Sequence, residues 1–137
     1  MALSTKMKIC LIDDESSSRK SIKEMLKRIG FKNIHDFELP NTAFDNLKKS
    51  IELEDPFKLV ISDLDMPNLN GMELYDEVAK AGITVPFLLM SGSNDQAMIK
   101  QAVQNGIKNI ILKPFSQADL NDRLARMLQG PAKKKAA

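Results

Sequence analysis

The segment 57–71, FKLVISDLDMPNLNG, decides the fold that this sequence predicts. It opens with a short apolar run rich in β-branched residues, bracketed by Pro56 and Pro67, which favours a buried strand over a helix. The strand delivers Asp63 to its carboxyl end, where Pro67 and the final Asn-Gly pair turn the chain. Because open α/β sheets bind ligands at the carboxyl ends of their strands, Asp63 is the candidate reactive residue.

Similar apolar segments recur on both sides of this strand. We expect further strands at about 7–12, 33–37, 85–90 and 107–112, each followed by a helical pattern of apolar residues three and four positions apart. Gly30, Gly82 and Gly106 end three of the helices, and Ser116 caps the last one. The side chains expected on the inner helix faces are Ile22, Met25, Leu26, Ile29, Phe44, Leu47, Ile51, Leu74, Val78, Ala81, Ile99, Ala102, Val103, Leu120, Leu124, Met127 and Leu128.

Five strands that alternate with five helices predict a parallel sheet covered on both faces, a doubly wound α/β fold. With 137 residues the chain is long enough for one domain with a substantial core. We expect this domain to span 6–129, after an N-terminal extension at 1–5. The Lys-rich segment 130–137 has too little apolar surface to pack, so we expect it to be disordered.

Composition and charge exclude several classes of protein. The net charge is +2, from 20 basic and 18 acidic residues, so we do not expect an extended nucleic-acid surface. Cys10 is the single cysteine and lies in an apolar run, so we expect a buried thiol and no internal disulfide. No apolar run is long enough to cross a bilayer, and the N-terminus has no signal-peptide pattern. The sequence therefore predicts a cytoplasmic protein without a membrane partner.

Polar side chains follow four of the five predicted strands. Asp13 and Asp14 follow the first strand, Asp63 the third, Ser91 the fourth and Lys113 the fifth. Parallel strands point their carboxyl ends the same way, so we expect these groups to converge on one pocket.

The three acids have the composition of a site for a divalent cation. Asp13, Asp14 and Asp63 would repel one another, and one of them would take up a proton unless a cation joined them. Oxygen ligands in a shallow site suit Mg²⁺. His35 is the only histidine and Cys10 the only thiol, so a zinc site is not expected.

A carboxylate beside Mg²⁺ and a lysine has a characteristic chemistry. It can act as a nucleophile toward a phosphoryl group and form an aspartyl phosphate. Lys113 would neutralise charge on the transferred group, and the Ser91 hydroxyl could hydrogen-bond one of its oxygens. This transfer needs mainly positioning and charge stabilisation, which these groups offer.

From about Lys6 to Gln129 the sequence resembles the receiver domains of two-component response regulators. The likeness is carried by IDD at 12–14, SDLDMP at 62–67, NG at 70–71, MSG at 90–92 and LKPF at 112–115. It implies a flavodoxin-like fold whose five parallel strands have the order 2-1-3-4-5. It also implies a non-enzymatic signalling protein that catalyses only its own phosphorylation and dephosphorylation.

The resemblance assigns a role to each acid. It implies that Asp63 would accept a phosphoryl group from a histidine kinase or a histidine phosphotransfer protein. It also implies that Asp13 and Asp14 would hold Mg²⁺, directly or through water, together with Asp63 and the main-chain carbonyl of Asp65. The side chain of Asp65 either alters the lifetime of the phosphoryl group or is a solvent-facing loop acid.

The resemblance also implies a switch. Ser91 would be its hydroxyl residue, and Lys113, before a cis prolyl bond, would pair with the phosphoryl group. The family often places an aromatic residue three positions before this lysine, whereas here the position holds Ile110. Either another side chain couples the pocket to the surface, or the switch is weaker.

The chain ends soon after the fifth predicted helix, which suggests a stand-alone receiver, a monomer or weak homodimer. We expect its output to be a changed protein-binding surface on the fourth helix, fifth strand and fifth helix. Two alternatives stay open. Asp63 and Asp65 also resemble the nucleophile and general acid of haloacid-dehalogenase-type phosphatases. A receiver-like scaffold that works without phosphorylation is the other.

Overall fold

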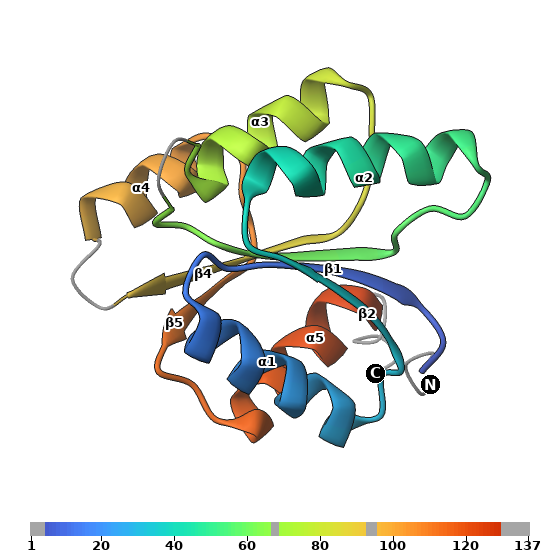
Figure 1. Cartoon of the computed structure of the whole chain (residues 1–137). Coiled ribbons are helices and arrows are strands. Elements are labelled where there is room, and N and C mark those ends of the chain that lie inside the picture. The colour runs from blue at the N-terminus through green and yellow to red at the C-terminus, as the bar shows by residue number, and fades with distance from the viewer. Residues whose placement is uncertain (1–4, 67–68, 93–95, 130–137) are drawn as a thin grey trace, which may run out of the picture.

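The computed structural model describes residues 5–66, 69–92 and 96–129. Five strands form one sheet with helices on both faces (Figure 1). In chain order the elements are β1 (Lys8–Ile12), α1 (Ser16–Ile29), β2 (Asn33–Phe37), α2 (Pro40–Glu52), β3 (Leu59–Asp63), α3 (Gly71–Lys80), β4 (Phe87–Gly92), α4 (Gln96–Gln104), β5 (Ile110–Lys113) and α5 (Gln117–Gln129). The predicted tail at 130–137 and most of the predicted extension at 1–5 lie outside the described residues.

All strand pairs are parallel, and the sheet order is β2-β1-β3-β4-β5, as predicted. Ile12 pairs with Ser62, so Asp13 and Asp63 leave neighbouring strands at the same level. Gly92 pairs with Lys113, which brings the end of β5 to this edge too. The register therefore gathers the predicted strand-end residues at one edge of the sheet.

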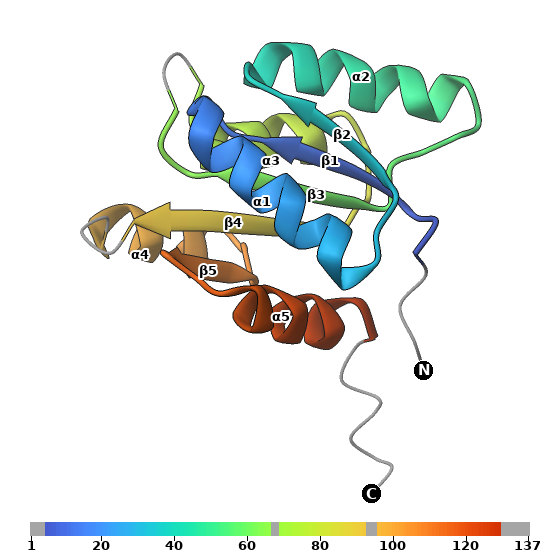
Figure 2. The same ribbon diagram turned by 60° about the horizontal axis from the view of Figure 1, so that its bottom comes forward.

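The helices divide between the two faces of the sheet. Helices α1 and α5 cover one face, and α2, α3 and α4 cover the other (Figures 1 and 2). Strand residues alternate between them: Ile9 and Leu11 pack toward α1 and α5, whereas Cys10 and Ile12 pack toward the opposite side. Both faces of β3 are therefore buried, which explains its nearly continuous apolar sequence.

Three residues predicted on inner helix faces are exposed instead. In α2 the buried stripe is Ala43, Leu47 and Ser50, and Ile51 lies one position past it, 49% exposed. In α4 the buried residue is Ala102, so that Val103, turned away by one helical position, is 57% exposed. Ala81 is exposed because it follows the last residue of α3.

Strands β4 and β5 begin two and three residues later than predicted. The run 85–90 marked the fourth strand, but β4 starts at Phe87, because Pro86 contributes only its carbonyl oxygen, which accepts a hydrogen bond from the Val60 N–H at 2.9 Å. Ile107 is buried although β5 starts at Ile110. An apolar residue that is buried in the loop before a strand therefore looks, in the sequence, like part of the strand.

Several predicted helix boundaries are confirmed. The N–H of Gly30, at φ 125°, donates to the carbonyls of Leu26 and Lys27 at the end of α1. Before α5 the Ser116 Oγ accepts from the Asp119 N–H at 3.0 Å, and an Asp119 carboxylate oxygen accepts from the Ser116 N–H at 3.1 Å. Among the described residues no helix is both long and apolar enough to span a membrane.

Gly71, the first residue of α3, lies against the end of β3. A Cβ atom there would collide with the main-chain oxygen of Asp63 and would lie 2.8 Å from Leu89 Cδ1. The sequence needs glycine at this position because the backbone of α3 touches the backbone that carries Asp63.

We therefore expect Gly71→Ala to lower the free energy of unfolding by about 3 kcal/mol, the upper range for overpacking in a core. Urea denaturation followed by circular dichroism measures the change. Gly82→Ala is the control: its Cβ meets nothing within 4 Å, and only its φ of 77° opposes a side chain. A cost at Gly71 no larger than that at Gly82 would contradict the steric argument.

Candidate functional site

The ends of three strands supply the charged centre of the site. Asp13 follows β1, Asp63 ends β3 and Lys113 ends β5. The Lys113 Nζ lies 3.2 Å from the Asp13 Oδ2 and 3.3 Å from the Asp63 Oδ2. Asp13 is fully buried and Asp63 is only 9% exposed. The structure thus brings together the first-strand acid, the third-strand acid and the fifth-strand lysine that the sequence predicted to converge.

Asp14 completes a cluster of acids. One carboxylate oxygen from each of Asp13, Asp14 and Asp63 lies within 4.8 Å of the others, the only group of potential metal ligands of this kind in the part of the chain that the structure describes. Three carboxylates face the single ammonium of Lys113, so the cluster has an excess of negative charge. The donor set, all oxygen and partly open to solvent, fits Mg²⁺.

Asp65 is not part of this cluster. Its side chain is exposed, and its backbone N–H donates to the Asp63 carboxylate. The role predicted for its main-chain carbonyl as a metal ligand stays a prediction.

The surroundings of Asp63 and Lys113 shift both pKa values. Burial raises the pKa of Asp63 to about 6, and the charge of Asp13 adds to the rise, while Lys113 and the Asp65 N–H oppose it. Burial alone would lower the pKa of Lys113, but the adjacent Asp63 and Asp13 carboxylates outweigh it and raise this pKa. At neutral pH Asp63 is thus an ionised carboxylate whose pKa lies only slightly below the pH, and it stands beside a charged lysine.

Two residues of α1 that the sequence reasoning missed hold Asp13. The Ser18 hydroxyl donates to the Asp13 Oδ2 at 2.6 Å, and the Arg19 Nη1 donates to the Asp13 main-chain oxygen at 2.7 Å. Arg19 also pairs with Asp36 of β2 through its Nε at 3.1 Å. Lys23, whose hydrogen bond is the largest cause, and Arg19 lower the pKa of Asp36. Polar residues in the first turns of a helix are common, so no sequence signal separated these two from surface residues.

The predicted switch residues, Ser91 and Ile110, lie toward the face of the sheet that α2, α3 and α4 cover. Ser91 is fully buried, and its hydroxyl donates to the Gly92 main-chain oxygen at 3.2 Å. Ser91 follows Leu89 by two positions, and both Leu89 and Ile110 pack in the core toward α4. Among the described residues the hydroxyl is not hydrogen-bonded to Asp63 or Lys113, so its role as a switch stays a prediction. The Lys113–Pro114 bond is cis, as the resemblance implied.

Comparison with known proteins agrees with the fold. Residues 9–125 match the family model described as the response regulator receiver domain. The chain belongs to this family, and it is a receiver domain of the two-component type.

Its relatives include chemotaxis proteins of similar length. It is 31% identical over 132 residues to the chemotaxis protein CheY-3 of Vibrio cholerae, an alignment that covers 93% of this chain and 95% of the relative. It is 32% identical to the chemotaxis protein CheY homolog of Campylobacter jejuni, covering 89% and 92% of the two chains. Among solved structures, a receiver domain protein of Clostridium thermocellum superposes with a TM-score of 0.77 at 25% identity, covering 96% of this chain and 99% of that chain.

The raised pKa of Asp63 predicts that its charge destabilises the folded protein without metal. Asparagine resembles the protonated carboxyl, so in EDTA we expect Asp63→Asn to raise the free energy of unfolding near neutral pH by about 2 kcal/mol. The stability difference between the variant and the wild type should be complete above the folded pKa of about 6. It should shrink as the pH falls toward the ordinary pKa of an aspartate, because Asp63 of the folded wild type then binds a proton and loses its charge. Urea titrations at a series of pH values measure both effects. A variant less stable than the wild type at neutral pH would contradict the prediction.

Proposed function

We propose that this receiver is a Mg²⁺-dependent phosphoryl acceptor, modified at Asp63 by a histidine kinase or a histidine phosphotransfer protein. One observation carries the proposal: the Asp63 carboxylate lies 3.3 Å from the Lys113 ammonium, inside a cluster of acids that fits Mg²⁺. A nucleophile, a fixed cation and an oxygen donor set at one sheet edge are the parts that phosphoryl transfer requires.

In the proposed reaction a carboxylate oxygen of Asp63 attacks the phosphorus of a phosphohistidine. The oxygen–phosphorus bond forms as the phosphorus–nitrogen bond breaks, and the imidazole leaves. Lys113 neutralises part of the negative charge on the phosphoryl oxygens. Asp13, Asp14 and Asp63 would hold Mg²⁺, with the Asp65 carbonyl, and the ion supplies further charge neutralisation there when bound.

The exposed position of Asp65 favours an acceptor over a phosphatase. A general acid in a haloacid-dehalogenase-type reaction must reach the leaving group beside the nucleophile. The Asp65 side chain faces solvent and lies outside the cluster of Asp13, Asp14 and Asp63. We therefore propose that the protein catalyses only its own phosphorylation and dephosphorylation.

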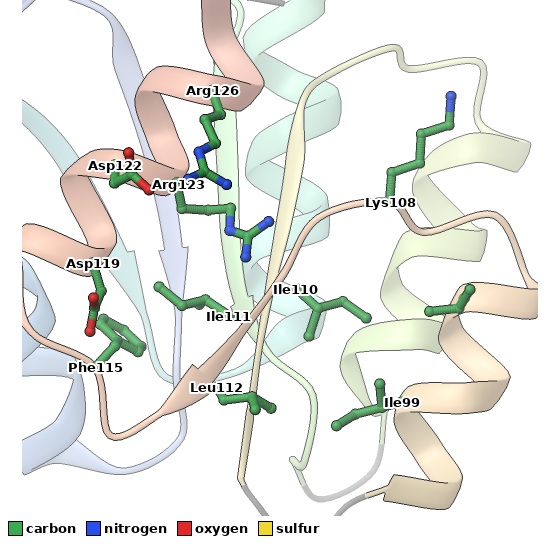
Figure 3. Close-up of a pocket in the computed structure, with 11 residues that line it drawn as sticks. Ile99, Lys108, Ile110, Ile111, Leu112, Phe115, Asp119, Asp122, Arg123 and Arg126 are labelled. Atoms are coloured by element: carbon green, nitrogen blue, oxygen red, sulfur yellow. Dashed lines mark ion pairs between the residues drawn. The ribbon is translucent and has the colours of Figure 1, made fainter. Parts of the chain in front are cut away.

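The proposed output surface is a groove over β5, between α4 and α5 (Figure 3). Its volume is about 700 Å³, and two of its lining side chains, Val103 and Leu112, are 57% and 52% exposed. Ile110 lines the same groove and packs in the core on the side of Ser91. This apolar surface is of the kind that partner proteins cover.

The charges of the groove suggest the chemistry of the partner. Asp122 pairs with Arg126 at 3.0 Å, and Asp119 is engaged with Ser116. Lys108 and Arg123 make no ion pair among the described residues, so the groove offers unpaired positive charge beside apolar surface. We propose that it binds a protein segment with apolar side chains next to carboxylates.

Incubation with acetyl phosphate and Mg²⁺ tests the acceptor proposal. We expect one phosphoryl adduct by intact-mass analysis, lost in Asp63→Asn and when EDTA replaces Mg²⁺. The matched control is Asp65→Asn, which removes an exposed acid two residues away and should retain the adduct. An unmodified wild type, or sustained turnover of a phosphate monoester by it, would overturn the proposal.

Phosphorylation should also change the groove. We expect the amide chemical shifts of α4, β5 and α5 to move more than those of α2 when acetyl phosphate and Mg²⁺ are added, because Ile110 and Ser91 share the α4 side of the sheet. Two-dimensional NMR spectra of the wild type and of Asp63→Asn measure the difference. Changes confined to the strand ends around Asp63 would contradict a coupled output surface.

A further inference from the structure

Ser18 joins two charged residues of the site from the helix side. Its hydroxyl donates to the Asp13 Oδ2 at 2.6 Å and accepts from the Lys113 Nζ at 3.1 Å. The two bonds connect α1 both to the end of β1 and to the end of β5, which is 95 residues away in sequence. Neither the resemblance nor the strand-end pattern assigned a role to this residue.

The hydroxyl completes the hydrogen bonding of the lysine. The Lys113 Nζ has acceptors at 3.1, 3.2 and 3.3 Å, from Ser18, Asp13 and Asp63. An ammonium has three N–H donors, so these three acceptors match its capacity. Two of them are strand-end carboxylates, and Ser18 is the one that comes from a helix. Its loss would leave the ammonium free to turn on the remaining two contacts.

Helix α1 directs Ser18, but neither Ser16 nor Ser17, toward the site. Ser16 and Ser17 are exposed, whereas Ser18 is half-buried and lies one helical turn before the buried Ile22. Ser18 and Lys113 also line a cavity of about 180 Å³ between α1 and the segment after β5. The side chain thus has room for a γ-methyl group.

A neutral hydroxyl suits this position for an electrostatic reason. The site already holds three carboxylates against one lysine, and a fourth acid would increase their mutual repulsion. A hydroxyl accepts from the ammonium without adding charge. It also binds the ammonium less strongly than a carboxylate does, so it places the lysine without competing strongly with new oxygens on Asp63.

We propose that Ser18 is a positioning residue for phosphoryl transfer, which sets the place of the Lys113 ammonium beside Asp13 and Asp63. The proposal rests on the proposed function at Asp63. It adds a residue of α1 to the strand-end groups, one that acts through the lysine and does not itself touch the phosphoryl group.

The experiment compares Ser18→Val with Ser18→Thr, which have the same shape and differ in the hydroxyl. With acetyl phosphate and Mg²⁺, we expect the rate of adduct formation to fall about tenfold in Ser18→Val and to stay within about twofold of the wild type in Ser18→Thr, because the lost bond involves charged groups. Ser17→Val controls for a β-branched residue in the same helical turn and should match the wild type. If Ser18→Val does not fold, Ser18→Ala replaces it, with a smaller loss expected because water from the cavity can take the place of the hydroxyl.

A double-mutant cycle separates positioning from a purely structural contact. In a Lys113→Ala background the valine and threonine variants should have equal rates, because the residue on which Ser18 acts is gone. If the valine and threonine variants differ in rate by the same factor with Lys113 and without it, Ser18 only anchors α1, and the proposal is overturned.

A second measurement needs neither metal nor phosphoryl donor. In the unmodified protein in EDTA, the Lys113 side-chain ¹⁵N–H signal should be observable by NMR in the wild type and in Ser18→Thr, and lost to exchange with water in Ser18→Val. If the wild type forms the adduct but the valine and threonine variants form it at the same rate, the proposal for Ser18 is wrong and the proposed function at Asp63 stands. If the wild type forms no adduct at Asp63, the proposed function fails and Ser18 positioning falls with it, whatever the NMR signal does.

Discussion

The contact of the Lys113 ammonium with the buried carboxylates of Asp13 and Asp63 is the interaction on which the site depends. The lysine lies 100 residues from Asp13 and 50 from Asp63 in sequence, yet its Nζ is within 3.3 Å of an oxygen of each. The positive charge of the lysine offsets the repulsion between two carboxylates held in contact with it. The parallel register, the order of the strands and the helices that bury their faces all serve to bring these three side chains to the same edge.

The charged cluster and the exposed groove lie in different parts of the molecule. Asp13 contacts Ser18 and Arg19 of α1, and Lys113 contacts Ser18. Asp13, Asp63 and Lys113 all follow strand residues that pack toward α1 and α5. The exposed groove lies along β5, the last strand of the sheet, and is shared by α4 from one face and α5 from the other. Strand β5 contributes to both, since Ile110, Ile111 and Leu112 line the groove and Lys113, its last residue, belongs to the cluster. A four-residue strand therefore links the charged cluster to the apolar surface.

Most of the fold and the acidic centre of the site follow from the sequence, because they depend on periodicity and on strand ends. A parallel sheet forces Asp13, Asp63 and Lys113 together once their strands are recognised. The phase of a short helix does not follow as readily: the exposure of Ile51 and Val103 depends on a rotation of one residue about the helix axis. Ser18 and Arg19 were missed because a polar residue early in a helix has the same sequence signature whether it faces water or a carboxylate.

The burial of Cys10 has a practical consequence for work on this chain. It lies in the middle of β1 with no exposed surface, and burial raises the pKa of its thiol far above the ordinary value. Only the thiolate reacts readily with alkylating reagents, so Cys10 of the folded protein does not react with maleimide dyes or spin labels. A single cysteine introduced at an exposed position can thus carry a site-specific label without first removing the natural thiol from the core.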